Sequence, residues 1–527
     1  MRQAERAYEY IVVGGGTAGC VLAARLSEEP AARVLLIEAG PEEMPEAAVV
    51  PHTWTNLIGS PADCGDLVFD ETTNRSTLLS RGRGLGGSTD INGMVFVRGH
   101  RSGYDVWPDQ GAPGWGFDDL LPFFKRSENA IGRDAAVRGT DGPLTVRAAA
   151  DHNPVTAALL DAAREVGLPQ ATDPSSGLEE GLGLHDLAIA RGCRVTAAGA
   201  YLTPEVRSRD NLTIVTDALV NRVLVEDGRC TGVEYAAQGR GHTAVHTALS
   251  AGEVILTAGT VGSAHLLLRS GIGPASHLRD VGLDPIVDLP GVGANLHDHP
   301  LTGVSYEAAQ PVPPGRNNHA EASGIIRDPE HTEYLGPGGR PRPTLQFIMF
   351  SNARHLPPYF GPENGYTIAF SVMNPKSRGA VRLTGPAPDS APLVEPRYLS
   401  DPRDLDSMLT NLRIAREIGA AHALDPWRLR EVHPGPEITG DGALRDYLRD
   451  SYCPYWHAVG TCRIGTDAMA VVDPHLRVHG TTGLRVADAS VMPSVPAANT
   501  MPAVYGIAER AASLIAADQY STAAPQR

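Results

Sequence analysis

The chain begins with an apolar run that ends in glycines and is followed by a helical segment and a second apolar run. Residues 8–13 are apolar and rich in β-branched side chains, which is typical of a strand covered on both faces. We expect a helix over roughly 17–27 and a second buried strand over 34–37. This order predicts a strand–helix–strand unit of a parallel sheet.

Similar patterns return in the middle of the chain and near its end. Residues 212–236 predict two or three short strands with a turn at Asp227-Gly228, and 253–257 predict a strand followed by a helix. Residues 484–487 predict another strand, and 499–517 a last helix before an unstructured tail. Scattered pieces of this kind indicate a nucleotide-binding domain of discontinuous segments, with a second domain inserted. The first domain is expected to comprise residues 1–155, 191–305 and 471–527, and the second 156–190 and 306–470.

The turn after the first strand carries the pattern Gly14-x-Gly16-x-x-Gly19. Gly14 allows a tight turn, Gly16 lets the backbone approach a pyrophosphate, and Gly19 lets the helix lie close to the strand. The helix that begins at Thr17 and Ala18 offers free N–H groups and the positive end of its dipole to phosphates. The pattern predicts dinucleotide binding; its alternative is a purely structural turn.

Glu38 ends the second strand, about 20 residues after Gly16. At this spacing a carboxylate is placed to accept hydrogen bonds from a ribose diol. A carboxylate here, rather than a nearby arginine, favours FAD or NAD over NADP.

A second glycine-rich stretch spans residues 81–93 and interleaves its glycines with two arginines and small polar side chains. A segment so poor in side chains lets backbone lie against a large flat ligand, which an NAD-binding fold does not need. The alternative is a flexible surface loop. The cofactor contacts predicted in this stretch are Arg83, Gly86, Gly87, Ser88 and Gly93.

Composition narrows the class of protein. The net charge is −16 and no block of Lys or Arg is present, which disfavours nucleic acids and anionic membranes as partners. The six cysteines show no disulfide or zinc spacing, and the pair His297 and His299 lacks a third ligand, so no metal is expected. We interpret the loop of these two histidines as structural. Without a leader or a membrane-length apolar run, a cytoplasmic monomer or homodimer is expected.

Six ordered motifs resemble the glucose–methanol–choline (GMC) oxidoreductase family of flavoproteins. They are Gly14–Gly19 with Glu38, Gly84–Gly93, Thr257–Gly273, Gly291–His299, Trp456–Thr461 and Val486–Asn499. The resemblance implies an α/β fold, in which a Rossmann-like FAD-binding domain of discontinuous segments carries an inserted substrate-binding domain built on an antiparallel sheet. It also implies FAD, with the flavin ring between the two domains.

Three positions near the expected flavin depart from the family pattern. Some members carry a histidine covalently linked to the flavin where this chain has Ile91, so we expect the FAD to be non-covalent. Asp90 replaces a small residue beside it. Tyr455 stands where a branched aliphatic residue usually faces the flavin, and we expect it to reshape the substrate or oxygen pocket.

Oxidation of an alcohol needs a base for the hydroxyl proton and an acceptor for a hydride, and flavin N5 is such an acceptor. Histidine is the natural base near neutral pH. Most of the 18 histidines are expected to be surface or structural residues, but His457 lies in an aromatic context and matches the family's catalytic histidine. Asn499 matches the family position beside that base, on the substrate oxygen. It also fits a helix N-cap, because Pro502 follows at the expected helix start.

The resemblance assigns further contacts to the cofactor. Asp488 and Ala489 are expected at the pyrophosphate or ribityl region, although Asp488 also fits a turn-capping carboxylate. Asn92 is assigned to the flavin in the same way, and Val220 is expected to contact adenine through its backbone. The helix start at Thr500 is placed to direct its dipole at the flavin ring.

These residues predict an FAD-dependent oxidoreductase, choline dehydrogenase-like in pattern, that converts an alcohol to an aldehyde or ketone and passes electrons to oxygen or another acceptor. Tyr455, Trp456 and Phe347 are expected to line the substrate pocket, and residues 345–350 and the Tyr359-Phe360 pair to line or support it. The mixed apolar and aromatic character of these last two segments favours a primary alcohol with an aromatic or apolar part, while a cation such as choline stays open. The alternatives are a hydroxynitrile-lyase-like enzyme of the same fold and an NAD-dependent dehydrogenase. A non-catalytic flavin-binding protein is disfavoured because His457 and Asn499 are both present.

Overall fold

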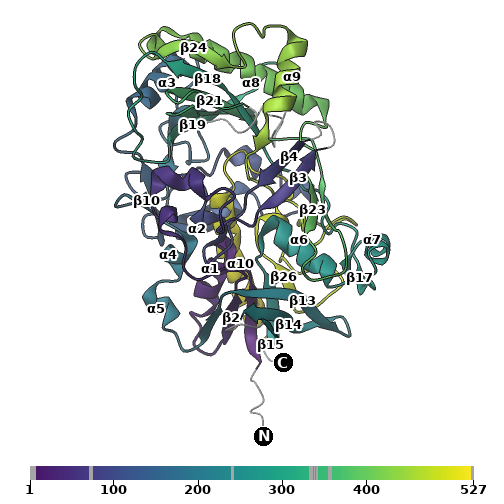
Figure 1. Ribbon diagram of the computed structural model, residues 1–527. Helices are drawn as coiled ribbons and strands as arrows, with labels where there is room; N and C mark the ends of the chain where they lie inside the picture. Colours follow the sequence, from purple (N-terminus) through teal and green to yellow (C-terminus); the bar gives the residue numbers. More distant parts are fainter. Residues whose placement is uncertain are drawn as a thin grey trace.

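The computed structural model describes residues 7–70, 75–238, 243–331, 336, 339, 342–353 and 359–523. Two large sheets lie at opposite ends of the molecule, one near the chain termini and one far from them (Figure 1). This is the mixed α/β architecture that the sequence predicts. None of the helices within these ranges combines the length and the apolar character that a membrane crossing requires.

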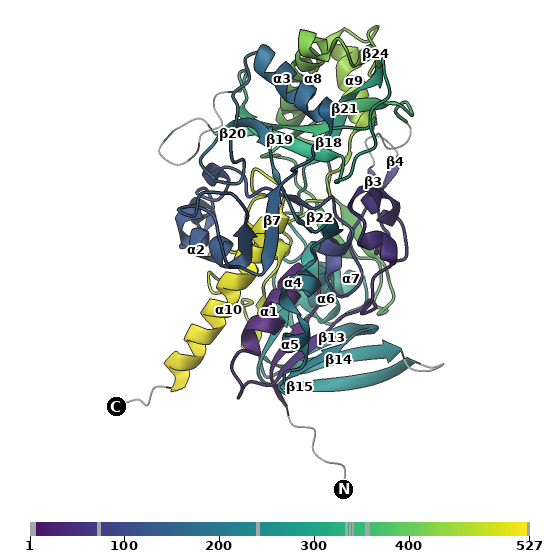
Figure 2. The same ribbon diagram turned by 90° about the vertical axis from the view of Figure 1, so that its left-hand side faces the viewer.

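The sheet near the termini is built on the predicted strand–helix–strand unit. In spatial order its strands are β12 (Leu212–Val215), β2 (Val34–Ile37), β1 (Tyr8–Val13), β15 (Thr243–Leu256), β14 (Arg229–Gln238) and β13 (Ala218–Glu226), and β26 (Leu484–Val486) also pairs with β15. β12, β2, β1, β15 and β26 pair in parallel, as expected for buried apolar strands. β13, β14 and the first half of β15 form an antiparallel extension that projects from the molecule (Figure 2). β15 is longer than the strand predicted at 253–257, because its first half pairs with β14.

The second sheet is antiparallel. In spatial order its strands are β24 (Arg428–His433), β18 (Pro300–Ala308), β21 (Gly365–Val372), β20 (Pro343–Phe350), β19 (Ala320–Arg327) and β8 (Gly181–Leu184), and β25 (Cys453–Pro454) also pairs with β18. β18 runs across the predicted domain boundary between residues 305 and 306.

Helices cover both sheets. They are α1 (Thr17–Leu26), α2 (Phe117–Ser127), α3 (Pro154–Glu165), α4 (Ala197–Tyr201), α5 (Pro204–Arg207), α6 (Gly259–Arg269), α7 (Ala275–Asp280), α8 (Pro402–Ala420), α9 (Asp441–Ser451) and α10 (Met501–Ala523). α3, α8 and α9 lie over the second sheet, at the end of the molecule away from the termini (Figure 2).

Four smaller sheets complete the described part of the fold. They are β22 (Ala380–Leu383), β23 (Pro392–Glu395), β3 (Asp66–Asp70) and β4 (Arg75–Leu79); β5 (Val95–Phe96), β9 (Asp186–Leu187), β7 (Leu144–Ala148) and β6 (Glu128–Ala130); β10 (Ile189–Ala190) with β11 (Cys193–Arg194); and β16 (Ile272–Gly273) with β17 (Val287–Asp288). Three short 3-10 helices contribute to the site described below: η2 (Pro51–Leu57), η3 (Gly87–Asp90) and η8 (Ala489–Val491).

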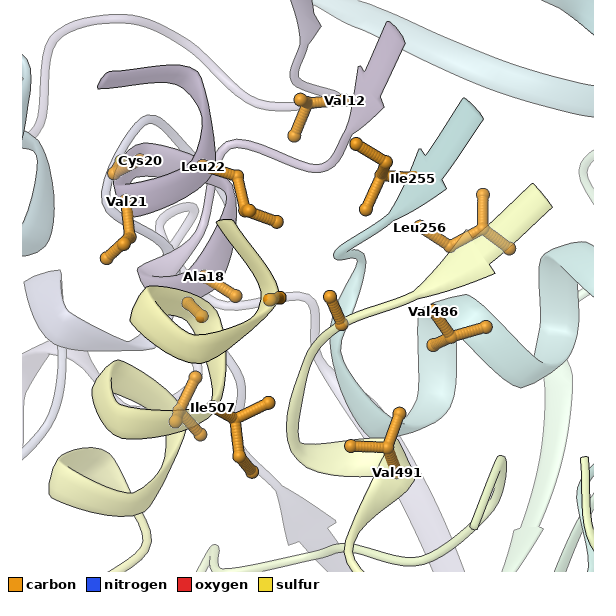
Figure 3. Packing of buried hydrophobic residues seen from close by; sticks show 14 of the residues in the cluster. Val12, Ala18, Cys20, Val21, Leu22, Ile255, Leu256, Val486, Val491 and Ile507 are labelled. Carbon is orange, nitrogen blue, oxygen red and sulfur yellow. The ribbon is translucent and has the colours of Figure 1, made fainter. Parts of the chain in front are cut away.

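Buried aliphatic side chains hold the first sheet to α1 and α10 (Figure 3). Val12 of β1, Ile255 of β15 and Val486 of β26 are fully buried, and they share one core cluster with Leu22 of α1 and Ile507 of α10. Each such side chain contributes about 1.5–3 kcal/mol when it leaves water. The packing therefore fixes α10, whose first turn reaches the site.

α10 corrects one expectation from the sequence. The helix was predicted to end at residue 517, before an unstructured tail, but it continues to Ala523. Its last turns are held by an ion pair, because Asp518 accepts from Arg485 of β26 at 2.7 Å.

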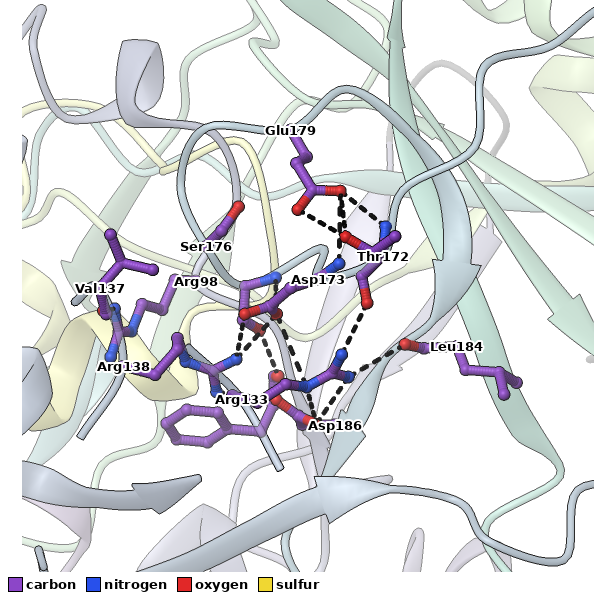
Figure 4. A network of polar contacts seen from close by, with 12 residues as sticks. Arg98, Arg133, Val137, Arg138, Thr172, Asp173, Ser176, Glu179, Leu184 and Asp186 are labelled. Carbon is purple, nitrogen blue, oxygen red and sulfur yellow. Dashed lines mark hydrogen bonds and ion pairs between the residues drawn. The ribbon is translucent and has the colours of Figure 1, made fainter. Parts of the chain in front are cut away.

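A buried network of charges joins segments that are distant in the sequence (Figure 4). Its members are Arg98, Arg133, Arg138, Glu128, Asp173 and Asp186. Arg138 is fully buried and pairs at 2.7–2.9 Å with the carboxylates of Glu128, Asp173 and Asp186. Three arginines thus meet three carboxylates, so the network stays neutral only while every member is present.

We expect Arg138→Met to lower the free energy of unfolding by about 3–5 kcal/mol, because buried carboxylates then lose their cation. Urea-induced unfolding measures this loss. Arg164→Gln is the matched control: it removes an exposed ion pair with Asp161 on α3, worth less than about 1 kcal/mol. Equal losses in the two variants would contradict a stabilising role for the network.

Candidate active site

A cavity of about 790 Å³ lies between the two large sheets, a size typical of ligand and cofactor sites. It is bounded by both glycine-rich stretches, by the start of α6, and by the segments that precede β19 and α10. The predicted site residues that line it are Gly14, Gly16, Thr17, Ala18, Glu38, Arg83, Gly87, Ser88, Asn92, Gly93, Val220, Tyr455, Trp456, His457, Asp488, Ala489, Asn499 and Thr500. Gly19, Gly86 and Phe347 do not line it.

The two glycine-rich stretches touch each other, which explains why Gly86 does not line the cavity, and Gly19 packs against Gly14 within the first stretch. A Cβ on Gly87 would lie 2.7 Å from the Cα of Gly16, and the N–H of Gly86 donates to the Gly15 carbonyl at 2.8 Å. A Cβ on Gly19 would lie 1.9 Å from the Gly14 carbonyl oxygen, so only glycine lets α1 approach β1 this closely. These close approaches leave a bare backbone floor of the kind a dinucleotide requires.

Glu38 secures the turn as well as facing the cavity. Its Oε2 accepts from the N–H of Gly15 at 2.6 Å, and its Oε1 accepts from the N–H of Gly40 at 2.8 Å. Burial raises the pKa of the carboxyl, and these backbone donors oppose the rise. Each oxygen has further lone-pair capacity, which fits the ribose contact predicted from the sequence.

The second glycine-rich stretch is held by Arg194, a residue that the sequence did not single out. Its Nη1 donates to the carbonyls of Thr89 (3.1 Å) and Asn92 (2.7 Å), and its Nε donates to the Ala48 carbonyl (2.6 Å). The Asn92 Oδ1 also accepts from the N–H of Met94 at 2.9 Å, so much of this side chain holds its own loop. An isolated arginine on a two-residue strand carries no motif, so no sequence signal pointed to it.

Asp488 shows the turn-capping geometry that was its alternative interpretation. Its Oδ1 accepts from the N–H of Ser490 (2.8 Å), and its Oδ2 accepts from the N–H of Gly259 (2.8 Å) and the hydroxyl of Ser263 (2.5 Å). The carboxylate therefore ties η8 to the start of α6 while lining the cavity.

His457 is positioned by a loop distant in the sequence. The Asp298 Oδ1 accepts from the N–H groups of both His299 and His457 at 2.7 Å, and its Oδ2 accepts from the Tyr398 hydroxyl at 2.6 Å. Backbone hydrogen bonds between His297 and Val459 continue this connection. Burial raises the pKa of Asp298 to about 6, and its three donors oppose the rise.

Both ring nitrogens of His457 have a partner. Nδ1 lies 3.0 Å from Nδ1 of His299, and Nε2 lies 3.1 Å from the Asn499 Nδ2. Burial lowers the pKa of His457 well below its usual value, and lowers that of His299 to about 3, so both rings are neutral at pH 7. The Asn499 amide donates to Nε2, which places the lone pair of His457 there and its proton on Nδ1, toward His299.

Asn499 does not serve as the helix cap. α10 begins at Met501, and the carbonyl that accepts from Val504, at 3.0 Å, belongs to Thr500. The N-cap interpretation of Asn499 is therefore wrong, because its side chain turns to His457 instead. Its Oδ1 is buried and has no hydrogen-bond partner among the described residues, so the site holds an acceptor for a ligand.

The two histidines of the 297–299 loop have different roles. His297 is structural as interpreted: its Nδ1 contacts the Asn295 carbonyl at 2.6 Å, and its Nε2 accepts from the N–H of Val495 at 2.9 Å. His299 instead contacts His457 directly. Across the described chain, no three His, Cys, Asp or Glu side chains gather in a way that would hold a metal ion, and none of the six cysteines is in a disulfide.

The wall opposite the glycine-rich floor is apolar and aromatic. The Tyr455 ring lies against His457, with ring centroids 4.0 Å apart at 33°. Trp54 meets Trp456 edge-on, with ring centroids 6.4 Å apart. The sequence did not point to Trp54, because residues 40–80 show little periodicity. The remaining side chains of this wall are Leu301, Ala320, Ile348 and Phe350.

Phe347 corrects a prediction. It is fully buried, but it belongs to the cluster of side chains between the second sheet and helices α3 and α8. Side chains alternate along a strand, so Ile348 and Phe350 of β20 face the cavity and Phe347 faces away.

Comparisons with known proteins agree with this geometry. Two family models, both described as GMC oxidoreductase, match residues 8–301 and 375–508. An oxygen-dependent choline dehydrogenase of Vibrio vulnificus is 34% identical over 96% of this chain and 94% of the relative. A choline oxidase of Arthrobacter globiformis is 37% identical over 97% of this chain and 94% of the relative.

Solved structures show the same fold. The crystal structure of pyridoxine 4-oxidase from Mesorbium loti matches with a TM-score of 0.90 and 35% identity, over 98% of this chain and 100% of that chain. A fungal aryl-alcohol oxidase matches with a TM-score of 0.85 and 26% identity, over 98% of this chain and 99% of that chain. The predicted fold class is confirmed. The chain belongs to the GMC oxidoreductase family, and it is an enzyme of the predicted class, an FAD-dependent alcohol oxidase or dehydrogenase.

Proposed function

We propose that the protein oxidises a primary alcohol with an apolar or aromatic portion to the aldehyde, and that Nε2 of His457 takes the hydroxyl proton. One observation carries the proposal: a neutral imidazole holds its lone pair on Nε2 at the cavity, where the Asn499 amide N–H occupies it until an alcohol hydroxyl takes that place. A base of this kind needs no prior deprotonation at neutral pH.

Asn499 and His299 complete the proton-handling group. The Asn499 Nδ2, 3.1 Å from His457 Nε2, is placed to donate to the alcohol oxygen once the alcohol hydroxyl has replaced it at Nε2. Nδ1 of His299 accepts a hydrogen bond from the Nδ1–H of His457. This bond keeps the lone pair of His457 on Nε2 and fixes the orientation of its ring. We assign His299 a positioning role, because it meets the reacting atoms only through His457.

The chain's residues fit FAD. The glycine backbones at Gly16 and Gly87 form its floor, Glu38 faces the ribose position, and Val220 lines the adenine end. FAD bound in this cavity supplies the hydride acceptor, N5 of its flavin ring. Ile91 is a hydrocarbon side chain without a nucleophile, so we propose that the cofactor is held non-covalently.

Side chains on the opposite wall favour the substrate class. Leu301, Ile348 and Phe350 contribute only hydrocarbon surface, and Tyr455 presents its ring beside His457. An aromatic or apolar alcohol buries its non-reacting part against such a wall at a gain of about 25 cal/mol per Å². The electron acceptor is oxygen or another oxidant, and assays with and without oxygen distinguish the two.

We expect His457→Ala to retain yellow FAD, because the histidine is not part of the glycine-rich floor. Flavin reduction by alcohol should slow by about 10²–10⁴-fold, because the base is lost. Anaerobic rapid mixing with a panel of alcohols, followed by flavin absorbance, measures this. Acid denaturation should release the FAD from both wild type and variant.

Three results would count against these assignments. Near-normal flavin reduction in His457→Ala would remove the histidine from its role. Turnover of hydroxynitriles by the wild type, with no flavin bleaching by any alcohol, would favour the lyase alternative. Flavin that stays with the denatured chain would overturn non-covalent binding.

Tyr455 is expected to set the preference for aromatic alcohols. Tyr455→Val should lower the ratio of kcat/KM for an aromatic over a small aliphatic alcohol by about 10-fold or more, because the ring surface beside His457 is lost. Tyr455→Phe is the matched control, since it keeps the ring and should keep most of the preference. An unchanged ratio in Tyr455→Val would contradict this role.

A further inference from the structure

A carboxyl group is buried behind the second glycine-rich stretch, at a position where the chain departs from the family pattern. Asp90 ends η3 and is 1% exposed; its neighbours Thr89 and Ile91 line the large cavity, but Asp90 does not. Its carboxyl group lies against the backbone of Gly86, because a Cβ on that glycine would collide with both oxygens. Asp90 therefore supports the glycine-rich floor from the side opposite the cavity.

The carboxyl group of Asp90 lacks the partners that a buried carboxylate needs. Its Oδ2 has no hydrogen-bond partner among the described residues, which also give it no ion pair. The Thr196 side chain supplies a hydrogen bond to the group. Asp298, by contrast, has three donors at 2.6–2.7 Å. A buried carboxylate without a cation or several donors is costly, so the surroundings of Asp90 suit the neutral, protonated acid.

The cation that acts on Asp90 is Arg194, and it is engaged elsewhere. Its guanidinium donates to the carbonyls of Ala48, Thr89 and Asn92. Its Nη2 is buried and has no hydrogen-bond partner in the described part of the chain. The charges of Arg194 and Asp90 interact, yet each side chain keeps one unpartnered atom and no ion pair joins them.

Three further titratable groups act on Asp90 or respond to it: Glu38 at the end of β2, Cys20 of α1 and Tyr505 of α10. Burial raises the pKa values of the Cys20 thiol and the Tyr505 hydroxyl well above their usual range, so both stay neutral. Burial, against the opposing charge of Arg194 and with a contribution from Glu38, raises the pKa of Asp90 to about 8. Asp90 is thus mostly protonated at pH 7 and loses its proton to the solvent as the pH rises through about 8.

We propose that protonated Asp90 is a positioning residue for FAD. With its proton, the neutral side chain stays behind Gly86 and supports the glycine-rich floor. Without it, the carboxylate pairs with the unpartnered Nη2 of Arg194, and the floor loses its support. The proposal rests on the FAD cavity proposed above. Asp90 acts through Gly86 and Arg194, since it does not line the cavity itself.

Two contacts carry the effect of Asp90 to the cavity. The N–H of Gly86 donates to the Gly15 carbonyl at 2.8 Å and joins the two glycine-rich stretches. Arg194 holds two carbonyls of the second stretch, and an arginine that pairs with an ionised Asp90 draws away from them. Ionisation also adds a negative charge near Glu38, on the side where the pyrophosphate of FAD brings its own. Both changes weaken FAD binding.

The dependence of FAD affinity on pH tests the proposal. The FAD-loaded protein is diluted at a series of pH values from about 6.5 to about 9.5, and the fluorescence of released flavin gives the dissociation constant. The wild type should bind FAD about 10-fold or more weakly at the upper end, because binding favours the protonated acid. Asp90→Asn has the same shape but no proton to lose. It should match the wild type at pH 6.5 and keep that affinity at pH 9.5.

Asp161→Asn is the matched control, since it removes an exposed carboxylate on α3 and should follow the wild-type profile. The infrared carbonyl band of protonated aspartic acid gives a second measurement in the wild type: it should be present at pH 7 and absent by about pH 9.5.

Parallel pH profiles in wild type and Asp90→Asn, or an affinity of Asp90→Asn that is lower by the same factor at every pH, would overturn the proposal. Absence of the infrared band at pH 7 would overturn it even if Asp90→Asn failed to fold. A wild type that holds no FAD at pH 6.5 would overturn the cofactor assignment, and this proposal with it.

Discussion

The carboxylate of Asp298 is the contact on which the active site depends. It accepts backbone N–H groups from His299 and from His457, which lies 159 residues further along the chain, and it accepts the Tyr398 hydroxyl as well. A buried carboxylate is stable only when such donors surround it. The same contact that satisfies Asp298 therefore brings two imidazoles within 3.0 Å of each other before any ligand arrives.

Burial then determines how these groups act. Burial lowers the pKa values of His299 and His457, so both imidazoles stay neutral at pH 7. Because both rings are neutral, the Nδ1–H of His457 can donate to the lone pair on Nδ1 of His299. The Asn499 amide donates to Nε2, the other ring nitrogen of His457. Its own Oδ1 has no partner among the described residues and remains as an acceptor for a ligand. The proposed proton transfer thus relies on burial and on hydrogen-bond direction.

Local chemistry was predictable from the sequence, whereas contacts across the fold were not. The Gly14–Gly19 turn and the 81–93 stretch were recognised because each depends on residues that are neighbours in the chain. The face of β20 was assigned wrongly at Phe347, since alternation reveals two faces but not which one meets a cavity. Arg194 and the contact of His299 with His457 arise only when distant segments fold together, and no spacing in the sequence signals them. The sequence allows two roles for Asn499, a helix N-cap and a partner of His457. The start of α10 at Met501 decides between them.

We propose that His457 is a neutral base, with its lone pair on Nε2, before any substrate binds. Nitrogen NMR of protein labelled with ¹⁵N-histidine tests it directly, and a His457→Asn sample identifies the signals of this residue. At pH 7 we expect Nε2 to be unprotonated and Nδ1 to carry the proton, and this state should persist below pH 6.5, because burial lowers the pKa of His457. A His457 ring that is doubly protonated at pH 7, or that carries its single proton on Nε2, would contradict the proposed role of this residue.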